Sequence, residues 1–574
     1  MKGMGFRQSN AWLHTWAGLV LGWLLFAVFV TGTLSFFRDE ISGWMRPELH
    51  ASQPDAGSAM RAVAAVQHVA PGATAWSITL PNERSRVIQL QWNDAESPAD
   101  KSRGKHAVLD AATGEQLHAR NTRGADFFYR FHFELYGMPY WAGRWVVGTA
   151  TMFMLVALLS GIVTHKKIFA DFFTFRRRKG QRSWMDVHNV LGVLALPFHL
   201  LITYSGLILL MATLMPWAIH TVYRGDASAA YSDLRGDIFR VTEFRRPSPP
   251  GSVPLTDLAP LIEQARQRWP HGIASIAVAH AGTPGAIVEL QARVNNTLSG
   301  RGWGERMRYS GVTGEPLGAP QPPALGGAAS VYNVTTALHM AHYAGAWLRW
   351  LCFFSGVLGS AMVATGLILW VVKRLPQQRK AGRHFGHRLV ECLNVGAIAG
   401  LLVAVAAYFW ANRLLPVGLA GRAGWEVNIF FLAWLVCAVH PWWRPHRTAW
   451  KEQCLAIAVL YAGLPLSNIP YPNSHLLATL SHGNWLVAGV DCVFLAVALL
   501  ALMAQWYLRV PSAAAAVAAR AQRGNATPMP ASVPAVGAPY PRVTPGAIVR
   551  VAPGGSADGA AAGGNQYSGG VGAS

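Results

Sequence analysis

The chain has 574 residues, of which 52% are hydrophobic and only 13% are charged. Soluble proteins carry about 25% charged residues, so this composition excludes an ordinary soluble protein and indicates a polytopic membrane protein. The net charge of +21 does not indicate a nucleic-acid partner, because the basic residues cluster in short loops beside apolar segments, where they orient a membrane protein.

The cysteines show neither CxxC nor CxxCH spacing, so zinc ribbons, iron–sulfur clusters and covalently attached c-type haem find no support. Their surroundings are apolar, which predicts buried free thiols. The five are Cys352, Cys392, Cys437, Cys454 and Cys492.

Apolar segments of about spanning length predict a mainly α-helical protein with about eight membrane spans. The segments fall near residues 11–37, 144–165, 184–216, 347–372, 388–410, 425–440, 452–466 and 484–508. The first is too long for the apolar region of a signal peptide and lacks a clear cleavage site, so we expect an uncleaved span.

Three basic segments fix the predicted orientation: residues 166–183, 373–387 and 441–451. By the positive-inside rule they are cytoplasmic, as are both termini. The predicted division is a first span (1–37), an outside module (38–143), two spans with a basic loop (144–216), a second outside module (217–346), a fourth span (347–372), a cytoplasmic loop (373–387), a four-span extension (388–508) and a disordered cytoplasmic tail (509–574).

The chain to about residue 375 reads as a duplication of span, outside α/β module and span. The turn sequence TGE occurs at Thr113–Glu115 and again at Thr313–Glu315, and a glycine there suits the positive φ of a tight turn. The exits of the two copies align Gly161 with Gly366. Both copies begin on the same side of the membrane, so we expect a pseudo-twofold axis along the membrane normal.

The entry spans repeat as well, and they carry histidines. His14 is followed by glycines at +4 and +18, and His188 has glycines at the same two offsets. A glycine one turn after a histidine lets a flat macrocycle lie against the helix, although glycine also permits close helix packing.

Residues Trp184–Pro216 are predicted to form one apolar helix that carries His188 and His199. Eleven residues correspond to about three turns, roughly 16 Å of rise and about 20° of rotation. The two imidazoles are therefore expected on one helix face at two depths.

Two levels of histidine emerge from these positions. The inner level holds His14, His165 and His188; the outer level holds His132, His199, His339 and His342. The alternative for any single one is an ordinary hydrogen-bonded residue at the membrane interface. His165 could simply contact head groups, and His199 could donate to a carbonyl freed by Pro197.

Paired neutral imidazoles in helices suit the two axial positions of a haem iron. A zinc or hard-ion site would need thiolates or carboxylates at the same depth, and a transporter would be expected to have carboxylates and broken helices at mid-membrane. These spans offer almost no acid. Asp186 alone lies close enough in the sequence to orient an imidazole.

The motifs LHTWAGL, SGIVTHKKIFADFFTFRRRKGQRSWMDVHNVLG, LDAATGE and TGLILWVVKR resemble the PepSY-associated transmembrane family over about residues 5–380. The resemblance implies an iron-regulated protein of the bacterial inner membrane with PepSY-like periplasmic modules. Members similar to ferrioxamine-type siderophore reductases bind b-type haem and reduce ferric siderophores in the periplasm. It also implies that His14, His132, His165, His188 and His342 match recurrent family histidines.

The leading hypothesis is a transmembrane oxidoreductase with two b-type haems. The inner haem would use His14, His165 and His188; the outer haem would use His132, His199 and His342. Electrons would come from a cytoplasmic or quinol donor and reach a periplasmic ferric siderophore. No nucleotide-binding glycine loop is present, so an internal NAD(P)H or flavin site is not expected. The alternatives are a non-enzymatic PepSY binding or regulatory protein, and a transporter.

Overall fold

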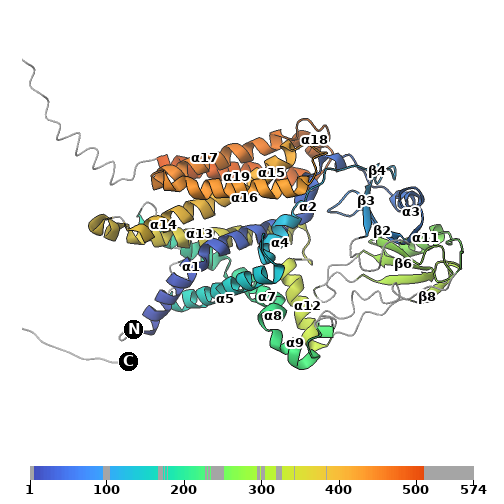
Figure 1. Cartoon of the computed structure of the whole chain (residues 1–574), viewed down its shortest axis with the longest axis horizontal. Helices are drawn as coiled ribbons and strands as arrows, with labels where there is room; N and C mark the ends of the chain where they lie inside the picture. The colour runs from blue at the N-terminus through green and yellow to red at the C-terminus, as the bar shows by residue number, and fades with distance from the viewer. Residues whose placement is uncertain are drawn as a thin grey trace, which may run out of the picture. The chain divides into compact units, whose positions relative to one another are not determined.

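The computed structural model describes residues 5–94, 104–165, 172, 175–176, 179–226, 229–230, 233, 251–293, 298, 304–318, 326–341, 343–382 and 384–509. The predicted disordered tail lies outside these residues from position 510 onward. The described part is mainly helical, with one antiparallel sheet (Figure 1).

The helices are grouped here by the predicted parts of the chain in which they lie. The first copy contains α1 (Phe6–Ser35), α2 (Arg38–Trp44), the 3-10 turn η1 (Pro47–Leu49), α3 (Ser58–Val69), α4 (Asp126–Glu134) and α5 (Tyr140–Thr164). The second contains α6 (Gln181–Leu194), α7 (Leu196–Leu209), α8 (Met211–Leu214), α9 (Pro216–Tyr223), α11 (Ala259–Arg268), α12 (Gly327–Met340) and α13 (Ala346–Ala381). The extension contains α14 (Phe385–Asn394), the π-helical turn η5 (Val395–Ala399), α15 (Gly400–Leu414), α16 (Arg422–Val439), η6 (His440–Trp442), α17 (His446–Leu466), α18 (Leu476–Ser481) and α19 (Trp485–Arg509).

Six helical stretches among the described residues are long and apolar enough to cross a membrane, and the bent pair α6–α7 brings the total to seven. The seventh predicted span, near residues 452–466, falls in α17, whose first two turns carry the polar sequence HRTAWKEQ. That helix does not meet the same criteria of length and composition, so the count of eight is not reached.

The predicted straight helix over Trp184–Pro216 is wrong. It breaks at Ala195, and α6 and α7 meet at an angle of 67°. Pro197 lies in the first turn of α7, where a proline is tolerated. Because a proline has no backbone N–H, the hydrogen-bond ladder of α6 cannot continue through it into α7. His188 and His199 therefore do not share one helix face.

The two modules predicted to lie outside contribute to a single eight-stranded sheet with strand order β4-β3-β2-β1-β5-β6-β7-β8. The first module provides β1 (Ala73–Thr79), β2 (Ile88–Asp94), β3 (Lys105–Leu109) and β4 (Gln116–Leu117); the second provides β5 (Ile273–Ala279), β6 (Ile287–Ala292), β7 (Arg306–Ser310) and β8 (Pro316–Gly318). The antiparallel pair β1–β5 joins them, and Ser77 lies opposite Ala277. These two positions are 200 residues apart, the spacing of the TGE turns, so the sheet is centred on the pseudo-twofold axis.

The two TGE turns have matching geometry. Gly114 and Gly314 have φ of 78° and 73°, in the left-handed region that favours glycine. Each glycine N–H donates to the carbonyl four residues earlier, Asp110 or Ser310, at 2.9 Å. Helices α3 and α11 pack on one face of this sheet. There Ala62 and Ala265 share an apolar core with strand residues such as Ile78 and Ile276.

The membrane helices repeat their contacts in the same way. Helix α1 packs on α4 and α5, and the bent pair α6–α7 packs on α12 and α13. Helix α1 also contacts α13, as α7 contacts α5.

The extension shares a core with the first copy. Trp44 of α2 is fully buried and meets Phe409 and Phe494 edge to face. Of the five cysteines, Cys492 on α19 is exposed, contrary to the prediction, and the other four are buried.

Candidate functional site

The inner histidine pair consists of His14 on α1 and His188 on α6. Their ring centres lie 6.1 Å apart. Nδ1 of His14 donates to the carbonyl of Ala157 at 2.8 Å, and Nδ1 of His188 donates to the carbonyl of Met362 at 2.9 Å. The two carbonyls come from the equivalent exit helices α5 and α13, so the pair follows the duplication.

The outer pair consists of His132 on α4 and His339 on α12, whose ring centres are 6.2 Å apart. Nδ1 of His132 donates to the carbonyl of Val28 at 2.8 Å. Nδ1 of His339 donates to Ser205 Oγ at 2.8 Å, and that hydroxyl in turn donates to the carbonyl of Leu201 at 2.6 Å. Val28 lies 14 residues beyond His14 on α1, roughly 21 Å along the helix.

A glycine lies against each ring. A Cβ at Gly161 or Gly366 would lie 3.2 or 3.1 Å from Cε1 of His14 or His188. At the outer level, Gly32 faces His132 and Gly206 faces His339, and their Cβ atoms would approach Cε1 to 2.6 and 3.2 Å. All four glycines are members of the predicted repeat. In the structure each of these glycines leaves room for an imidazole ring that a Cβ would crowd. The sequence did not distinguish this role from close helix packing.

The corner between α4 and α5 fixes His132. Gly143 packs so closely on the Glu134 carbonyl that a Cβ there would lie 1.6 Å from its oxygen. Leu135 ends α4 with φ 59° and ψ −163°, a conformation usually reserved for glycine. Such strain persists only where the surrounding packing imposes it.

The four rings present the same chemical state. Because a carbonyl or an already donating hydroxyl accepts from each Nδ1, the proton is on Nδ1 and Nε2 carries a lone pair. No hydrogen bond from a described residue reaches any of these Nε2 atoms. Burial lowers the pKa of His132 and lowers that of His339 to about 3, so both outer rings are neutral.

These features fit a metal held between two imidazoles. A metal-bound histidine commonly donates its other ring N–H to a carbonyl, which fixes tautomer and orientation. A metal–imidazole bond is about 2.0 Å long, so two rings on opposite sides of one ion have centres roughly 6 Å apart. Within the described ranges no group of three or more His, Cys, Asp or Glu is placed to hold a metal ion. Among these described residues the imidazoles form pairs, and two is the number of axial positions on a haem iron.

The other predicted site residues lie elsewhere. His165 ends α5 and its Nε2 lies 2.8 Å from the Asn189 amide, so this nitrogen is already engaged. His199 is fully buried between Phe29 and Gly359, and neither ring nitrogen has a hydrogen-bond partner among the described residues. His342 is outside the described residues. Asp186 orients no imidazole; it binds Arg176 of the basic loop at 2.7 Å.

His339 lies beside His132 in the structure but does not belong to the predicted ligand set. The sequence places His339 at the outer level, and the predicted outer ligands are His132, His199 and His342. The spacing to the glycines of the exit helices indicates that His339 is the counterpart of His132. His132 precedes Gly161 by 29 residues, and His339 precedes Gly366 by 27. His342 precedes it by only 24.

Comparison with known proteins agrees with this architecture. Residues 11–373 match the family described as the PepSY-associated TM region. The chain is also 27% identical over 323 residues to an uncharacterized protein of Pseudomonas aeruginosa. The matched stretch covers 54% of this chain and 77% of that protein.

Proposed function

Because the chain belongs to the PepSY-associated transmembrane family, we propose that it is a haem-binding oxidoreductase of the bacterial inner membrane. It carries electrons across the membrane to a ferric chelate of the siderophore class. The sheet faces the periplasm in this proposal, and both termini are cytoplasmic. The observation that carries the proposal is the presence of two imidazole pairs, one near each end of α1. In each ring Nδ1 donates a hydrogen bond, and Nε2 receives none from the described residues.

In this function, His14 and His188 hold the inner b-type haem, and His132 and His339 hold the outer one. A haem bound by two neutral imidazoles supplies one-electron transfer without opening a site for substrate on its iron. The carbonyls of Ala157, Met362 and Val28 keep three rings in the metal-binding tautomer, and Ser205 does so for His339. The four glycines let the rings reach these positions.

The substrate chemistry needs no acid or base from the protein. Hard oxygen ligands hold Fe(III) more tightly than Fe(II), so one electron weakens the chelate and releases the metal. The electron donor in this proposal is a quinol or a cytoplasmic reductant.

The test is the haem content of the purified, full-length protein, measured as the pyridine haemochrome and as the dithionite-reduced α-band. We expect about two haems per chain in the wild type and about one in His188→Ala and in His339→Ala. His165→Ala is the matched control, and we expect it to keep both.

A colourless wild-type protein would exclude this function and favour the non-enzymatic binding protein. If His339→Ala kept the wild-type haem content while His132→Ala lost a haem, the outer partner would be another residue. Substrate-dependent uptake that persisted in His188→Ala would favour a transporter.

A further inference from the structure

Basic side chains gather at one corner of the extension, where the start of α17 adjoins the end of α19. Arg447 and Lys451 lie one turn apart near the start of α17, and Arg509 is the last residue of α19. Nε of Arg447 donates to the carbonyl of Leu508 at 3.0 Å, which joins the two helix ends. We propose that this basic corner, Arg447 with Lys451 and Arg509, binds the headgroup of an anionic phospholipid.

The basic corner lies at the edge of the membrane. Helix α19 is long and apolar enough to cross a membrane, so each of its ends lies near an interface. Trp506 and Tyr507 in its last turn are exposed, as is Trp443 just before α17. Because exposed Trp and Tyr side chains are enriched at the level of the lipid headgroups, the neighbouring cations of the corner lie at the depth of the lipid phosphates.

The corner carries positive charge that the protein does not neutralise. Glu452 is the acidic residue next to Lys451 in the sequence, and it is already bound by Arg444 at 2.6 Å and by His440 at 2.8 Å. The side chains of Lys451 and Arg509 form no hydrogen bond or ion pair with another described residue. The two cations on α17 stand at positions i and i+4, where like charges repel each other. An anion beside them removes this repulsion.

A phospholipid suits this position better than a free anion. Its acyl chains hold the headgroup at the depth of the corner, and they find apolar surface on α19, where Leu502 and Met503 are exposed. Basic residues between membrane helices are a recurrent kind of site for anionic headgroups. The binding does not depend on the proposed haem sites.

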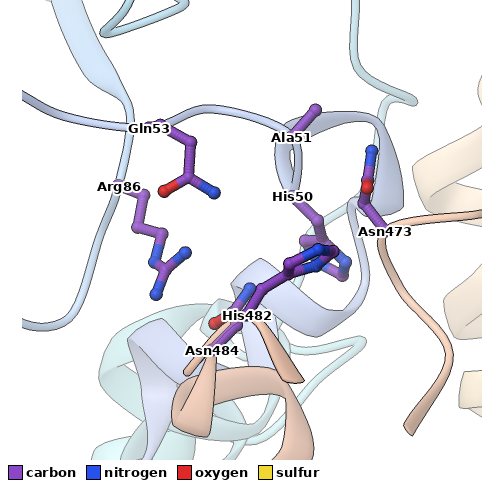
Figure 2. A pocket seen from close by; sticks show the side chains of 7 residues that line it. All are labelled: His50, Ala51, Gln53, Arg86, Asn473, His482 and Asn484. Atoms are coloured by element: carbon purple, nitrogen blue, oxygen red, sulfur yellow. The ribbon is translucent and has the colours of Figure 1, made fainter. Parts of the chain in front are cut away.

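Arg86 provides the contrast near the other end of α19, which is roughly 37 Å long. It lines a small pocket between the first module and the extension (Figure 2) and donates to the carbonyl of Gly483 at 3.1 Å. Arg86 is thus held by a backbone carbonyl, as Arg447 is, but no other Lys or Arg lines its pocket. It is a matched control for a single cation outside the corner.

The experiment is native mass spectrometry of the purified full-length protein in a neutral detergent, with equal amounts of phosphatidylglycerol and phosphatidylcholine. Both lipids contain a phosphate, but only phosphatidylglycerol has a net negative charge. Each cation near an anionic headgroup contributes about fivefold in binding. We expect the wild type to bind phosphatidylglycerol at least about tenfold more than phosphatidylcholine. Lys451→Gln and Arg509→Gln should each lower this ratio about fivefold.

Arg86→Gln and Lys380→Gln are the controls. Lys380 is exposed near the end of α13, in another basic segment of the chain. Both should leave the ratio unchanged, because a charge more than about 10 Å away is largely screened. The unfolding midpoint of each variant shows that it folds.

Three results would overturn the proposal. Equal binding of the two lipids by the wild type would exclude selection by charge. An equal loss in Lys380→Gln and Arg509→Gln would show that the basic surface attracts the lipid as a whole, without a site at the corner. Displacement of phosphatidylglycerol by inorganic phosphate would assign the corner to a free anion.

Discussion

At the scale of single residues, His50 shows how burial fixes a protonation state. Both of its ring nitrogens are used, one as a donor to Gly43 and one as an acceptor from Ser474. A second proton would break the bond to Ser474 and place a charge in a buried site near Arg413. Burial, with the charge of Arg413 as a smaller cause, lowers the pKa of His50 from 6.5 to about 4.

We therefore predict a pH-dependent loss of stability from this residue. Between pH 6.5 and about 4 the unfolded chain binds a proton that the folded chain does not, so stability is complete above this window and falls as the pH falls through it. The full effect is up to about 3 kcal/mol. The measurement is the thermal unfolding midpoint from about pH 8 to about pH 4. His50→Gln should show a flatter profile, and an identical slope in both proteins would contradict the prediction.

At the scale of elements, the sequence predicts what is local and misses what depends on distant partners. The TGE turns need a glycine with positive φ, and Gly114 and Gly314 supply it. The pairing of β1 with β5 could not be predicted in this way. Ser77 and Ala277 are 200 residues apart, and neither residue type indicates which strand lies beside it. The bend at Ala195 has a local cause in Pro197, but a proline in the first turn of a helix and one inside a kinked helix look alike in sequence.

The histidine pairs divide in the same way. His14 and His188 share their spacing to glycines, and this repeat predicts that they are equivalent. His339 and His132 stand at unequal distances from the TGE turns before them, so an alignment from the entry side does not match them. Counted back from Gly161 and Gly366 the two histidines nearly match, and the folded arrangement, with both rings facing a glycine, makes their equivalence clear.

The join between the modules gives a second prediction. Ser77 lies in the middle of β1, opposite Gln91 on one side and Ala277 on the other. Ser77→Pro removes a ladder N–H from a central strand and should cost about 3 kcal/mol or more. Ser77→Thr keeps that N–H and serves as the control. The measurement is thermal unfolding together with protease sensitivity of residues 251–293; equal behaviour of the two variants would contradict a continuous sheet.

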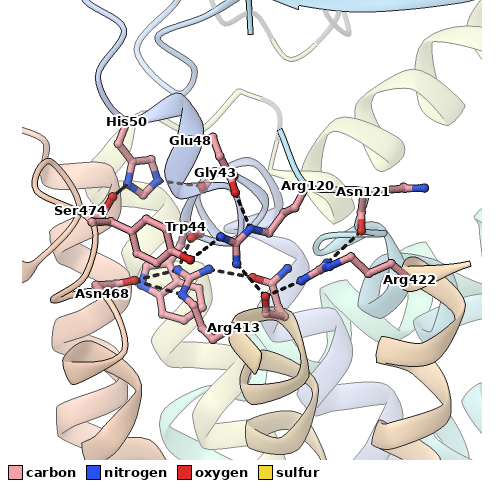
Figure 3. Close-up of polar contacts among 12 residues, drawn as sticks. Gly43, Trp44, Glu48, His50, Arg120, Asn121, Arg413, Arg422, Asn468 and Ser474 are labelled. Carbon is pink, nitrogen blue, oxygen red and sulfur yellow. Dashed lines mark hydrogen bonds and ion pairs between the residues drawn. The ribbon is translucent and has the colours of Figure 1, made fainter. Parts of the chain in front are cut away.

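At the scale of the whole molecule, buried ions fix the extension to the first copy (Figure 3). Arg120 donates to Glu48 at 2.8 Å within the module and to the carbonyl of Asn412 at 2.7 Å in the extension. Arg413 donates to the carbonyl of Trp44 at 2.7 Å. These contacts place the end of α15 beside the first module, so the extension is part of one structure with it.

The pair Arg422–Glu426 within this region gives the third prediction. Both side chains are fully buried, and Glu426 also accepts from Thr122 at 2.5 Å and from the Asn412 amide at 2.8 Å. Glu426→Gln leaves the guanidinium of Arg422 in a dry site without its counter-charge, which should cost about 3–5 kcal/mol. The measurement is the unfolding midpoint in detergent, with proteolysis between residues 415 and 421 as a second readout.

The matched comparison is the double variant Arg422→Met with Glu426→Leu, which removes both charges and keeps most of the volume. A buried ion pair replaced by apolar residues of similar size is often close to neutral, whereas a single unpaired charge is not. We expect the double variant to be more stable than Glu426→Gln alone, despite the lost bonds to Thr122 and Asn412. If it is less stable, the hydrogen bonds of this cluster and not its charges hold the extension in place.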